Sequence, residues 1–248
     1  MLKEAENLPA PGFDLEPISE SNLLNNLVDF QIKGLRKAIA GFILSADFVV
    51  GVGERVLLSG RSGSGKTSLL RTIAGLDPLR RHDQGHFYFG SEECSKVPVH
   101  QRQIGLMFQE PTLFPNLSVL ENITFGLRVR GVGKSQRENL GSQWLEKVGL
   151  KSKMESSVDH LSGGEKKRIA LARVLIWKPR LILLDEPFSN LDHELKQNLR
   201  KELIELHQLW PAPMLIVSHD QEELEYFGTK RLHLEWKDDS EIRIVKSC

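Results

Sequence analysis

The residues with the clearest chemical meaning form a glycine-rich loop at 60–67, which reads GRSGSGKT. An apolar run at 55–59 precedes the loop, and a helical pattern at 67–74 follows it. Glycines let backbone N–H groups converge on phosphate oxygens, and the N-terminus of the following helix adds a favourable partial charge. We therefore expect Lys66 to reach the β- and γ-phosphates of a nucleoside triphosphate, and Thr67 to bind Mg²⁺. The other phosphate contacts are expected from the rest of the loop and the residue after it: Gly60, Arg61, Ser62, Gly63, Ser64, Gly65 and Ser68.

A second candidate is the apolar run at 181–184, which ends in Asp185 and Glu186. Asp185 would lie in the Mg²⁺ shell of a phosphate site, and Glu186 could polarise a water in line with the γ-phosphate. By itself, a strand that ends in two carboxylates is common, and a solvated strand end is the simpler interpretation. The catalytic interpretation is favoured only because the same chain also contains the phosphate loop.

A third motif is Leu161-Ser162-Gly163-Gly164-Glu165. Ser162 and Glu165 have the spacing of a capping box that opens a helix through Ile176. The two glycines are not needed for a cap, because glycine weakens a first turn by up to ~1 kcal/mol. They predict that another group approaches the backbone closely at this helix start.

Composition excludes several classes of protein. The 248 residues carry 33 Lys+Arg and 33 Asp+Glu, so the formal net charge is zero and no broad basic face for nucleic acid is indicated. Cys94 and Cys248 are the only cysteines and lie far apart, which argues against zinc or a disulfide framework and favours a reduced compartment. We expect a flexible tail at 1–24, without a secretory signal or membrane span.

Short apolar runs separated by helical patterns predict an α/β fold. Strands are expected at 27–32 and 42–52, where the first run alternates in period two. Further strands are expected at 56–58, 181–184 and 214–217. These three runs are continuously apolar, as in strands buried on both faces of a parallel sheet.

The helical patterns lie between these strands. Leucines at 191–206 repeat at helical spacing, and the spacing of Ser135 and Glu138 predicts a capping box for a helix that ends at Gly149. Residues at about 110–175 are mostly helical and interrupt the strand-bearing halves. We expect them to form an inserted helical subdomain.

Six motifs in this order resemble the nucleotide-binding subunit of an ATP-binding cassette (ABC) transporter over residues 27–237. The loop at 60–67 resembles the family's Walker A motif, and 181–186 resembles Walker B with its catalytic glutamate. The other four are a signature motif at 161–165, a Q-loop at Phe108-Gln109, a D-loop at Ser189-Asn190-Leu191-Asp192 and a switch histidine at Val217-Ser218-His219-Asp220.

This resemblance implies a P-loop NTPase fold with a mostly parallel core sheet, an N-terminal antiparallel β subdomain and the inserted helical subdomain. The ATPase domain would occupy residues 25–240, followed by a C-terminal end at 241–248 without a regulatory domain. The cofactors implied are ATP and Mg²⁺.

The resemblance also implies a mechanism in two chains, in which two domains close head to tail around two ATP molecules. The signature residues Ser162, Gly163, Gly164 and Glu165 would face the nucleotide of the opposite subunit in a homodimer. Within one subunit, the implied roles are catalytic for Glu186, His219, Lys66 and Gln109, metal-binding for Thr67, Gln109 and Asp185, and D-loop contact for Asp192.

Two positions depart from the family pattern. Glu165 ends the signature motif where Gln is usual, so ATP-driven closure would be weaker unless Lys166, Lys167 and Arg168 offset its charge. The second is the aromatic that stacks on adenine, because Lys37 and Ala38 occupy its neighbourhood. Phe42 or Phe30 would supply a flat face instead, and a core position for Phe42 is an equal alternative.

The segments 97–102, 106–110 and 113–119 resemble bacterial importers of molybdate, iron, thiamine and polyamines. The implied partners are an integral membrane permease docking near Gln109–Leu117 and, indirectly, a solute-binding protein. The implied place is the cytoplasmic face of the inner membrane, as a peripheral subunit. Leu113, Phe114 and Leu117 would form the docking groove, although packing within the helical subdomain explains each of them nearly as well.

Two other functions stay open from the sequence. One is an exporter or lipoprotein-release ATPase, which the importer-like Q-loop region disfavours. The other is a soluble cassette ATPase acting on ribosomes, DNA or protein assembly, although the chain lacks the second cassette or long coiled coil that such proteins commonly carry. The partner that co-purifies with the chain distinguishes these functions.

Overall fold

A computed structural model describes residues 27–39, 41–220, 223, 226, 229–236 and 242–247. The chain divides into two compact units. The sheet unit comprises Leu27–Pro111 with Lys178–Cys248, and the helical unit includes Thr112–Trp177. The expected tail at 1–24 lies outside the described residues.

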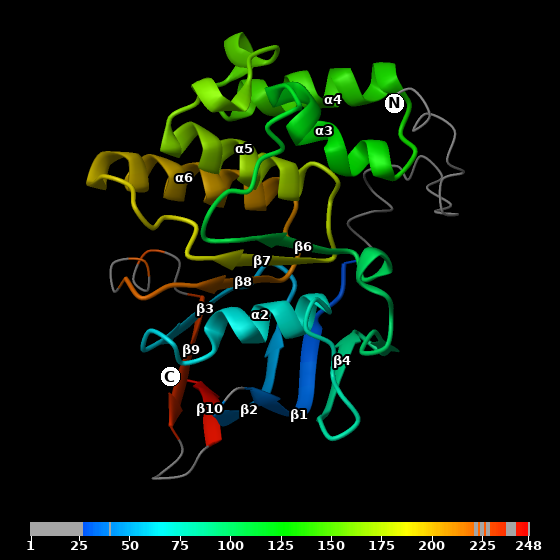
Figure 1. Cartoon of the computed structure of the whole chain (residues 1–248), viewed down its shortest axis with the longest axis vertical. Helices are drawn as coiled ribbons and strands as arrows, with labels where there is room; N and C mark the ends of the chain where they lie inside the picture. Colours follow the sequence, from blue (N-terminus) through cyan, green and yellow to red (C-terminus); the bar gives the residue numbers. More distant parts are fainter. Residues whose placement is uncertain are drawn as a thin grey trace. The chain divides into compact units, whose positions relative to one another are not determined.

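One mixed sheet dominates the sheet unit, and its strands are ordered β5-β4-β1-β2-β10-β9-β3-β8-β7-β6 (Figure 1). The strands are β1 (Phe30–Ile39), β2 (Phe42–Val50), β3 (Arg55–Gly60), β4 (Gln84–Phe89), β5 (Glu92–Glu93), β6 (Ile104–Met107), β7 (Leu181–Asp185), β8 (Met214–Val217), β9 (Lys230–Trp236) and β10 (Ile242–Ser247). The predicted α/β class with a mostly parallel core sheet is confirmed.

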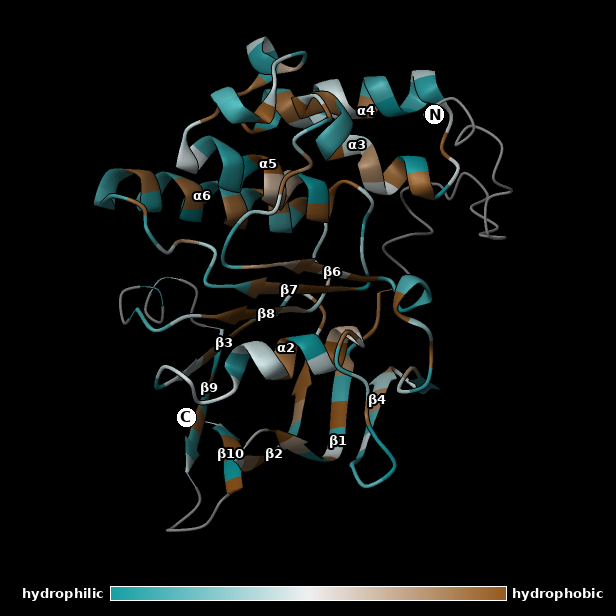
Figure 2. Cartoon of the chain, viewed as in Figure 1, coloured by the Kyte–Doolittle hydropathy of each residue, from teal (hydrophilic) through white to brown (hydrophobic). Residues whose placement is uncertain are grey.

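The parallel part of the sheet positions the site. Strand β8 pairs in parallel with β3 and β7, and β6 pairs in parallel with β7. Every residue of β7 and β8 is buried, and both strands are uniformly apolar apart from Asp185 (Figure 2). Because parallel strands end at the same edge, the loops that follow β3, β6, β7 and β8 meet there.

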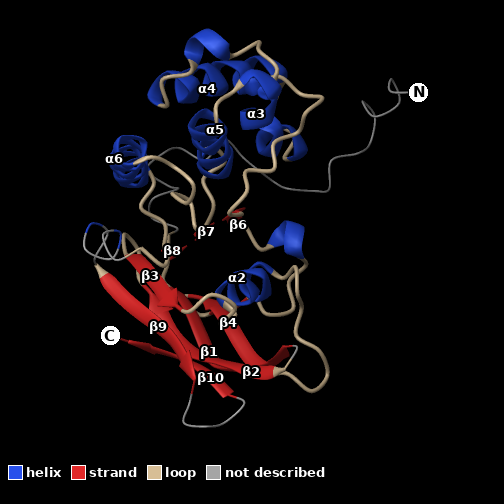
Figure 3. Cartoon of the chain, turned by 60° about the vertical axis from the view of Figure 1, so that its left-hand side comes forward, coloured by secondary structure: helices blue, strands red, loops and turns tan. Residues whose placement is uncertain are grey.

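The rest of the sheet is antiparallel around β1, which pairs with β2 on one side and β4 on the other (Figure 3). Burial alternates along β2, as expected for a sheet with one packed face. The expected C-terminal end contains β10, which pairs in parallel with β2 and antiparallel with β9. The end of the described chain is therefore part of the same sheet.

In the described part of the sheet unit, helices α2 and α6 accompany the strands. Helix α2 (Lys66–Ala74) begins directly after the glycine-rich loop, buries Leu69, Leu70 and Ile73, and ends at Gly75 with φ 84°. Helix α6 (His193–Leu209) carries the predicted leucine stripe and buries Leu199, Leu203 and Leu206. A short 3₁₀ helix, η2 (Val99–Gln101), precedes β6.

The helical unit contains α3 (Val119–Val129), α4 (Lys134–Lys147) and α5 (Gly163–Leu175), with short 3₁₀ helices at Lys151–Lys153 (η3) and Val158–His160 (η4). Helix α3 packs against both α4 and α5.

The capping predictions for these helices had mixed outcomes. The box of Ser162 and Glu165 at the start of α5 is confirmed, with both reciprocal hydrogen bonds present. The box predicted at Ser135 is wrong, because the N-cap of α4 is Gly133, two residues earlier, and it makes no side-chain cap. The predicted end at Gly149 is confirmed by its φ of 68°, directly after the C-cap.

Candidate nucleotide-binding site

The glycine-rich loop has a backbone conformation that favours glycine at three positions. Gly60, Gly63 and Gly65 have φ angles of 148°, 69° and 105°, respectively. Residues other than glycine rarely adopt these backbone angles. A Cβ at Gly65 would lie 2.9 Å from the Phe42 ring, and one at Gly60 would lie 2.7 Å from the Leu234 carbonyl oxygen. The loop therefore depends on glycine at these positions.

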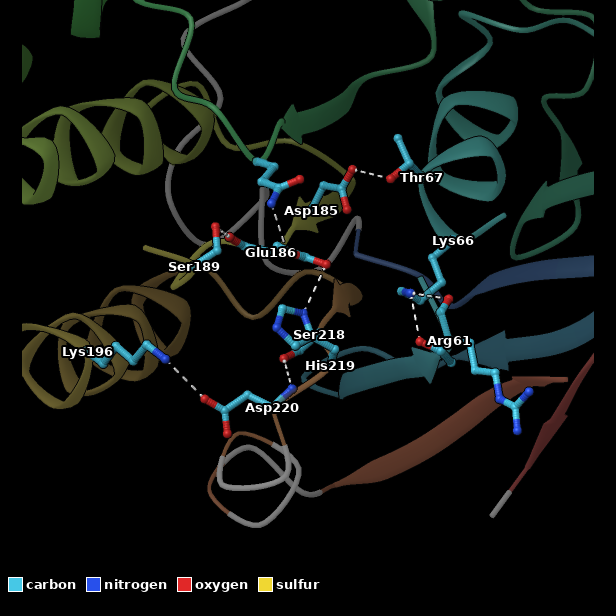
Figure 4. Close-up of polar contacts among 12 residues, drawn as sticks. Arg61, Lys66, Thr67, Asp185, Glu186, Ser189, Lys196, Ser218, His219 and Asp220 are labelled. Atoms are coloured by element: carbon cyan, nitrogen blue, oxygen red, sulfur yellow. Dashed lines mark hydrogen bonds and ion pairs between the residues drawn. The ribbon is translucent and has the colours of Figure 1, made fainter. Parts of the chain in front are cut away.

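Lys66 lies inside the curve of this loop (Figure 4). Its Nζ donates hydrogen bonds to the carbonyl oxygens of Gly60 at 2.8 Å and Arg61 at 3.0 Å. Burial lowers the pKa of Lys66, while the nearby carboxylates of Glu186 and Asp185 act to raise it. A phosphate bound in the loop would add negative charge and favour the ammonium form further.

Asp185 and Thr67 meet at the sheet edge, where Thr67 Oγ1 donates to Asp185 Oδ2 at 2.7 Å (Figure 4). Asp185 is 4% exposed, and burial raises its pKa. A divalent cation would offset this cost, and both side chains offer the oxygen ligands that Mg²⁺ prefers. The residues present therefore fit Mg²⁺.

Among the described residues, no three His, Cys, Asp or Glu side chains cluster as a self-contained metal site.

Glu186 is positioned by contacts on both of its carboxylate oxygens. Gln109 Nε2 donates to Oε2 at 3.0 Å. His219 Nδ1 lies 3.1 Å from Oε1 (Figure 4). The backbone of Glu186 has φ 46°, a costly conformation that concentrates at functional sites. The three candidate side chains, from the loops after β6, β7 and β8, therefore converge at one place.

A cavity of about 140 Å³ adjoins this carboxylate and is lined by polar side chains, including Gln109, Ser189 and Asp220. A water occupies about 30 Å³ of liquid volume, so the cavity is large enough for waters beside Glu186. The geometry can therefore hold a water against a carboxylate.

Supporting contacts around this cavity were not predicted from the sequence. The Ser189 hydroxyl donates to the Glu186 carbonyl oxygen at 3.0 Å. This hydrogen bond closes the turn that begins at Glu186. Lys196 Nζ reaches Asp220 Oδ2 at 3.2 Å, and the Asp220 N–H donates to Ser218 Oγ at 3.0 Å. Ser189, Ser218 and Asp220 lie within the D-loop and switch motifs of the sequence, whereas Lys196 lies in no motif.

Asp192 is the N-cap of α6, and its Oδ1 accepts from the Leu195 N–H at 2.9 Å. The side chain is exposed. Asp192 thus has a local structural role, which is compatible with a contact to a second subunit.

The signature residues lie at the start of α5 in the helical unit. Glu165 Oε2 accepts from the Ser162 N–H at 2.9 Å, and Glu165 Oε1 accepts from Lys153 Nζ at 2.6 Å. The hydrogen bond from Lys153 is the main reason why the pKa of Glu165 lies below its usual range. The charge of Glu165 is thus offset by Lys153, which lies in no motif of the sequence.

Gly163 is exposed, and a Cβ added there would meet no atom within 4 Å. Gly164 is buried within the same first turn. No close neighbour within the described chain explains the glycine at position 163.

The two aromatics considered for the nucleotide base are both in the core. Phe30 has no exposed surface, and Phe42 is 8% exposed with the Arg243 guanidinium 3.6 Å over its ring. Lys37, the residue in the family's aromatic neighbourhood, is buried and donates to the Asp77 and Pro78 carbonyl oxygens.

The residues considered for docking differ in exposure. Phe114 is 39% exposed and packs against Phe125 with ring centroids 4.4 Å apart, while Leu113 and Leu117 are partly buried. In the part of the chain that is described, no helix combines the length and apolar character needed to cross a bilayer.

These features together define a P-loop nucleotide-binding domain: a glycine loop around a lysine, a threonine hydrogen-bonded to the aspartate at a strand end, and a glutamate fixed by two side-chain contacts. The family model described as "ABC transporter" matches residues 44–189, and the chain belongs to this family. The resemblance inferred from the motifs is therefore confirmed.

Curated relatives include "Fe(3+) ions import ATP-binding protein FbpC" of Streptomyces avermitilis, 44% identical over 72% of this chain and 51% of that protein. "Spermidine/putrescine import ATP-binding protein PotA" of Mesoplasma florum is 39% identical over 82% of this chain and 56% of that protein. "Sulfate/thiosulfate import ATP-binding protein CysA" of Xanthomonas campestris is 42% identical over 78% of this chain and 57% of that protein. The chain spans about half the length of the curated relatives it matches.

Among solved structures, the chain is similar to the ATP-binding cassette MJ0796 in a dimeric, post-hydrolysis state bound to ADP and Pi. The TM-score is 0.72 at 26% sequence identity, and the match covers 83% of this chain and 94% of that one. The fold class expected from the sequence is confirmed by this likeness.

Proposed function

We propose that the chain binds and hydrolyses ATP and thereby powers import of a small solute through a separate permease. The observation that carries the ATPase proposal is the placement of Glu186, held by Gln109 and His219 beside the Thr67–Asp185 pair. Import is supported by the relatives, whose names describe import ATP-binding proteins for iron, polyamines and sulfate.

In this proposal each group has one task. The loop N–H groups and Lys66 hold the β- and γ-phosphates, and Glu186 orients or deprotonates the attacking water. His219 contacts the γ-phosphate from the end of β8. Mg²⁺, when bound through Asp185, Thr67 and the Gln109 amide oxygen, would neutralise charge on the phosphates.

We also propose a homodimer in which Ser162, Gly163 and Gly164 of one subunit contact the γ-phosphate held by the other. The open space at Gly163 supports this, since nothing within the described chain uses it. Glu165 stays in the capping box, and Asp192 lies at the subunit boundary. The related MJ0796 cassette is a dimer, which supports the same arrangement here.

The proposed membrane partner is a permease that docks near Gln109–Leu117, at the cytoplasmic face of the inner membrane. The half-exposed ring of Phe114 supports this segment as the contact. A solute-binding protein would take part indirectly. Co-purification of an integral membrane protein with the full chain would support transport, whereas co-purification of ribosomes or DNA would contradict it. The direction in which the complex of the chain and its membrane partner moves solute across a vesicle membrane separates import from export.

The Glu186→Gln variant tests the catalytic proposal. The amide keeps the shape and the contact to Gln109 but cannot act as a base, so we expect hydrolysis to fall about 10²- to 10⁴-fold. ATP binding should stay within about threefold of the original chain, and ATP should drive the variant into a dimer on size exclusion.

The matched control is Glu205→Gln, which makes the same change on the exposed face of α6 and should hydrolyse ATP at the normal rate. Normal phosphate release by Glu186→Gln, measured alongside this control, would show that Glu186 is not the catalytic carboxylate.

A further inference from the structure

A second pocket, of about 280 Å³, lies beside the phosphate loop and has no role in the function proposed above. Arg61 and Ser64 line it from the loop, His233–Trp236 from β9, and Arg243 from β10. The pocket therefore joins the phosphate loop to the C-terminal strand pair β9 and β10, which carries none of the six motifs.

Flat side chains stack along this pocket. The Arg243 guanidinium carbon lies 3.6 Å from the centroid of the Phe42 ring and 4.2 Å from that of the Trp236 ring. Arg243 Nη1 also donates a hydrogen bond to the Gly63 carbonyl oxygen in the phosphate loop. One side chain thus couples the loop, the β2 aromatic and the β9 aromatic.

Trp236 keeps an accessible surface in this arrangement, because it is 50% exposed, whereas Phe42 is almost completely covered. Ser64, on the pocket wall, is 8% exposed, and its hydroxyl has no hydrogen-bond partner among the described residues. The pocket therefore combines a free aromatic face with an unsatisfied buried hydroxyl, next to the loop expected to hold phosphates.

We propose that this pocket holds the base of the nucleotide, stacked on the indole of Trp236. This inference rests on the proposed nucleotide-binding function and adds the residue that recognises the base. Base stacking requires only a flat π face, so a tryptophan on β9 can serve where Lys37 and Ala38 stand in the usual neighbourhood of the aromatic. Lys37 itself is engaged with Asp77 and Pro78 and presents no flat surface.

Arg243 is a positioning residue in this proposal. Its planar guanidinium stacks on aromatic faces, which a lysine ammonium does not do in the same way. By contacting Phe42, Trp236 and the Gly63 carbonyl oxygen, it fixes the indole at a set place relative to the phosphate loop.

The test compares two ligands that differ in the base: ATP and inorganic tripolyphosphate, each titrated calorimetrically into the full chain with Mg²⁺. Trp236→Ala should weaken ATP binding about tenfold or more and leave tripolyphosphate binding unchanged. Trp236→Phe keeps a flat ring and should stay within about threefold for both ligands. Leu209→Ala removes a comparably exposed apolar side chain at the end of α6, which is 54% exposed, and should change neither affinity.

Arg243→Lys provides a second, independent readout. It keeps the positive charge but loses the planar stack, so we expect weaker ATP binding with tripolyphosphate unaffected. In the original chain, ATP should quench tryptophan fluorescence and tripolyphosphate should not, and the quench should be absent in Trp236→Phe.

An unchanged ATP affinity in Trp236→Ala, or equal losses for ATP and tripolyphosphate, would overturn the base-pocket proposal. Failure of the proposed nucleotide-binding function would look different. Either the original chain would bind neither ATP nor tripolyphosphate, or the Lys66→Met variant would bind both ligands as tightly as the original chain does.

Discussion

Gly65 joins the phosphate loop to the core through a contact that any side chain would disturb. Its φ is 105°, and an added Cβ would lie 2.9 Å from the Phe42 ring. Gly65→Ala would place a side chain in a left-handed conformation that costs about 1–3 kcal/mol, and it would push on a buried ring. We expect the free energy of unfolding to fall by about this amount and ATP affinity, measured by calorimetry, to fall at least about tenfold.

Gly133→Ala is the matched control for this prediction. Gly133 precedes α4 with φ −59°, and a Cβ there would meet nothing within 4 Å. Its replacement should leave both the melting temperature and ATP affinity unchanged. Normal ATP affinity in Gly65→Ala would mean that the loop does not require glycine at this position.

At the residue scale, the sequence could predict the site only where one short segment carries the information. Lys66, Thr67 and the glycines lie within one loop, so their types and spacing alone predict a phosphate-binding loop. Arg243 contacts Gly63 across 180 residues, and Lys153 contacts Glu165 across 12. Nothing in the local pattern marks such partners, because the fold alone brings them together.

At the element scale, the start of α5 shows a charge compensated by one neighbour. Lys153 holds Glu165, and the hydrogen bond lowers the pKa of Glu165. A carboxyl group whose pKa is lowered by folding stabilises the fold above its unfolded pKa, near 4.5. That stabilisation is lost as the pH falls through the lower pKa of the folded state.

Lys153→Gln should therefore lower the melting temperature at pH 7 by about 1–4 °C, since a partly exposed pair contributes up to about 1 kcal/mol. The difference from the original chain should shrink toward zero near pH 3, measured by circular dichroism on heating. Lys151→Gln, which removes an exposed pair with Glu146 instead, should show a smaller difference at pH 7. A difference that persists unchanged at pH 3 would contradict the assigned role of Glu165.

Elements were predicted well where burial is uniform and poorly where a cap or a pairing decides the boundary. The expected strand at 214–217 coincides with β8, because all four residues are buried and apolar. The box at Ser135 failed because Gly133 starts the helix, while a box formed by Ser118 and Glu121 at α3 was overlooked. Strand β10 was missed because its exposed charges hide its pairing with β2 and β9.

At the scale of the whole chain, the order of the sheet could not be derived from the strands alone. The motifs imply that β3 and β7 lie near each other, but β8 lies between them and carries His219 to the same edge. The sheet also places β9 beside β3, so the last described strands border the phosphate loop. That placement is the basis for a base-binding role of Trp236.

The stability of the whole chain should depend on pH through His207, which is buried at the end of α6. Its Nε2 donates to the Ala212 carbonyl oxygen at 2.7 Å, and its Nδ1 faces Arg55 Nη1 at 3.4 Å. Arginine is always a donor, so Nδ1 accepts and the ring is neutral. Burial lowers the pKa of His207 below its usual 6.5.

A histidine whose pKa is lowered by folding stabilises the fold above its unfolded pKa, because the unfolded chain binds the extra proton below it. Stability is therefore lost as the pH falls from 6.5, by at most about 1.4 kcal/mol per pH unit from this one group. His207→Gln can keep both hydrogen bonds without titrating, so its melting temperature should fall less between pH 7.5 and about 5.5 than that of the original chain. His100→Gln, at an exposed position, should keep the original pH dependence. Equal slopes for the original chain and His207→Gln would assign the loss of stability to other groups.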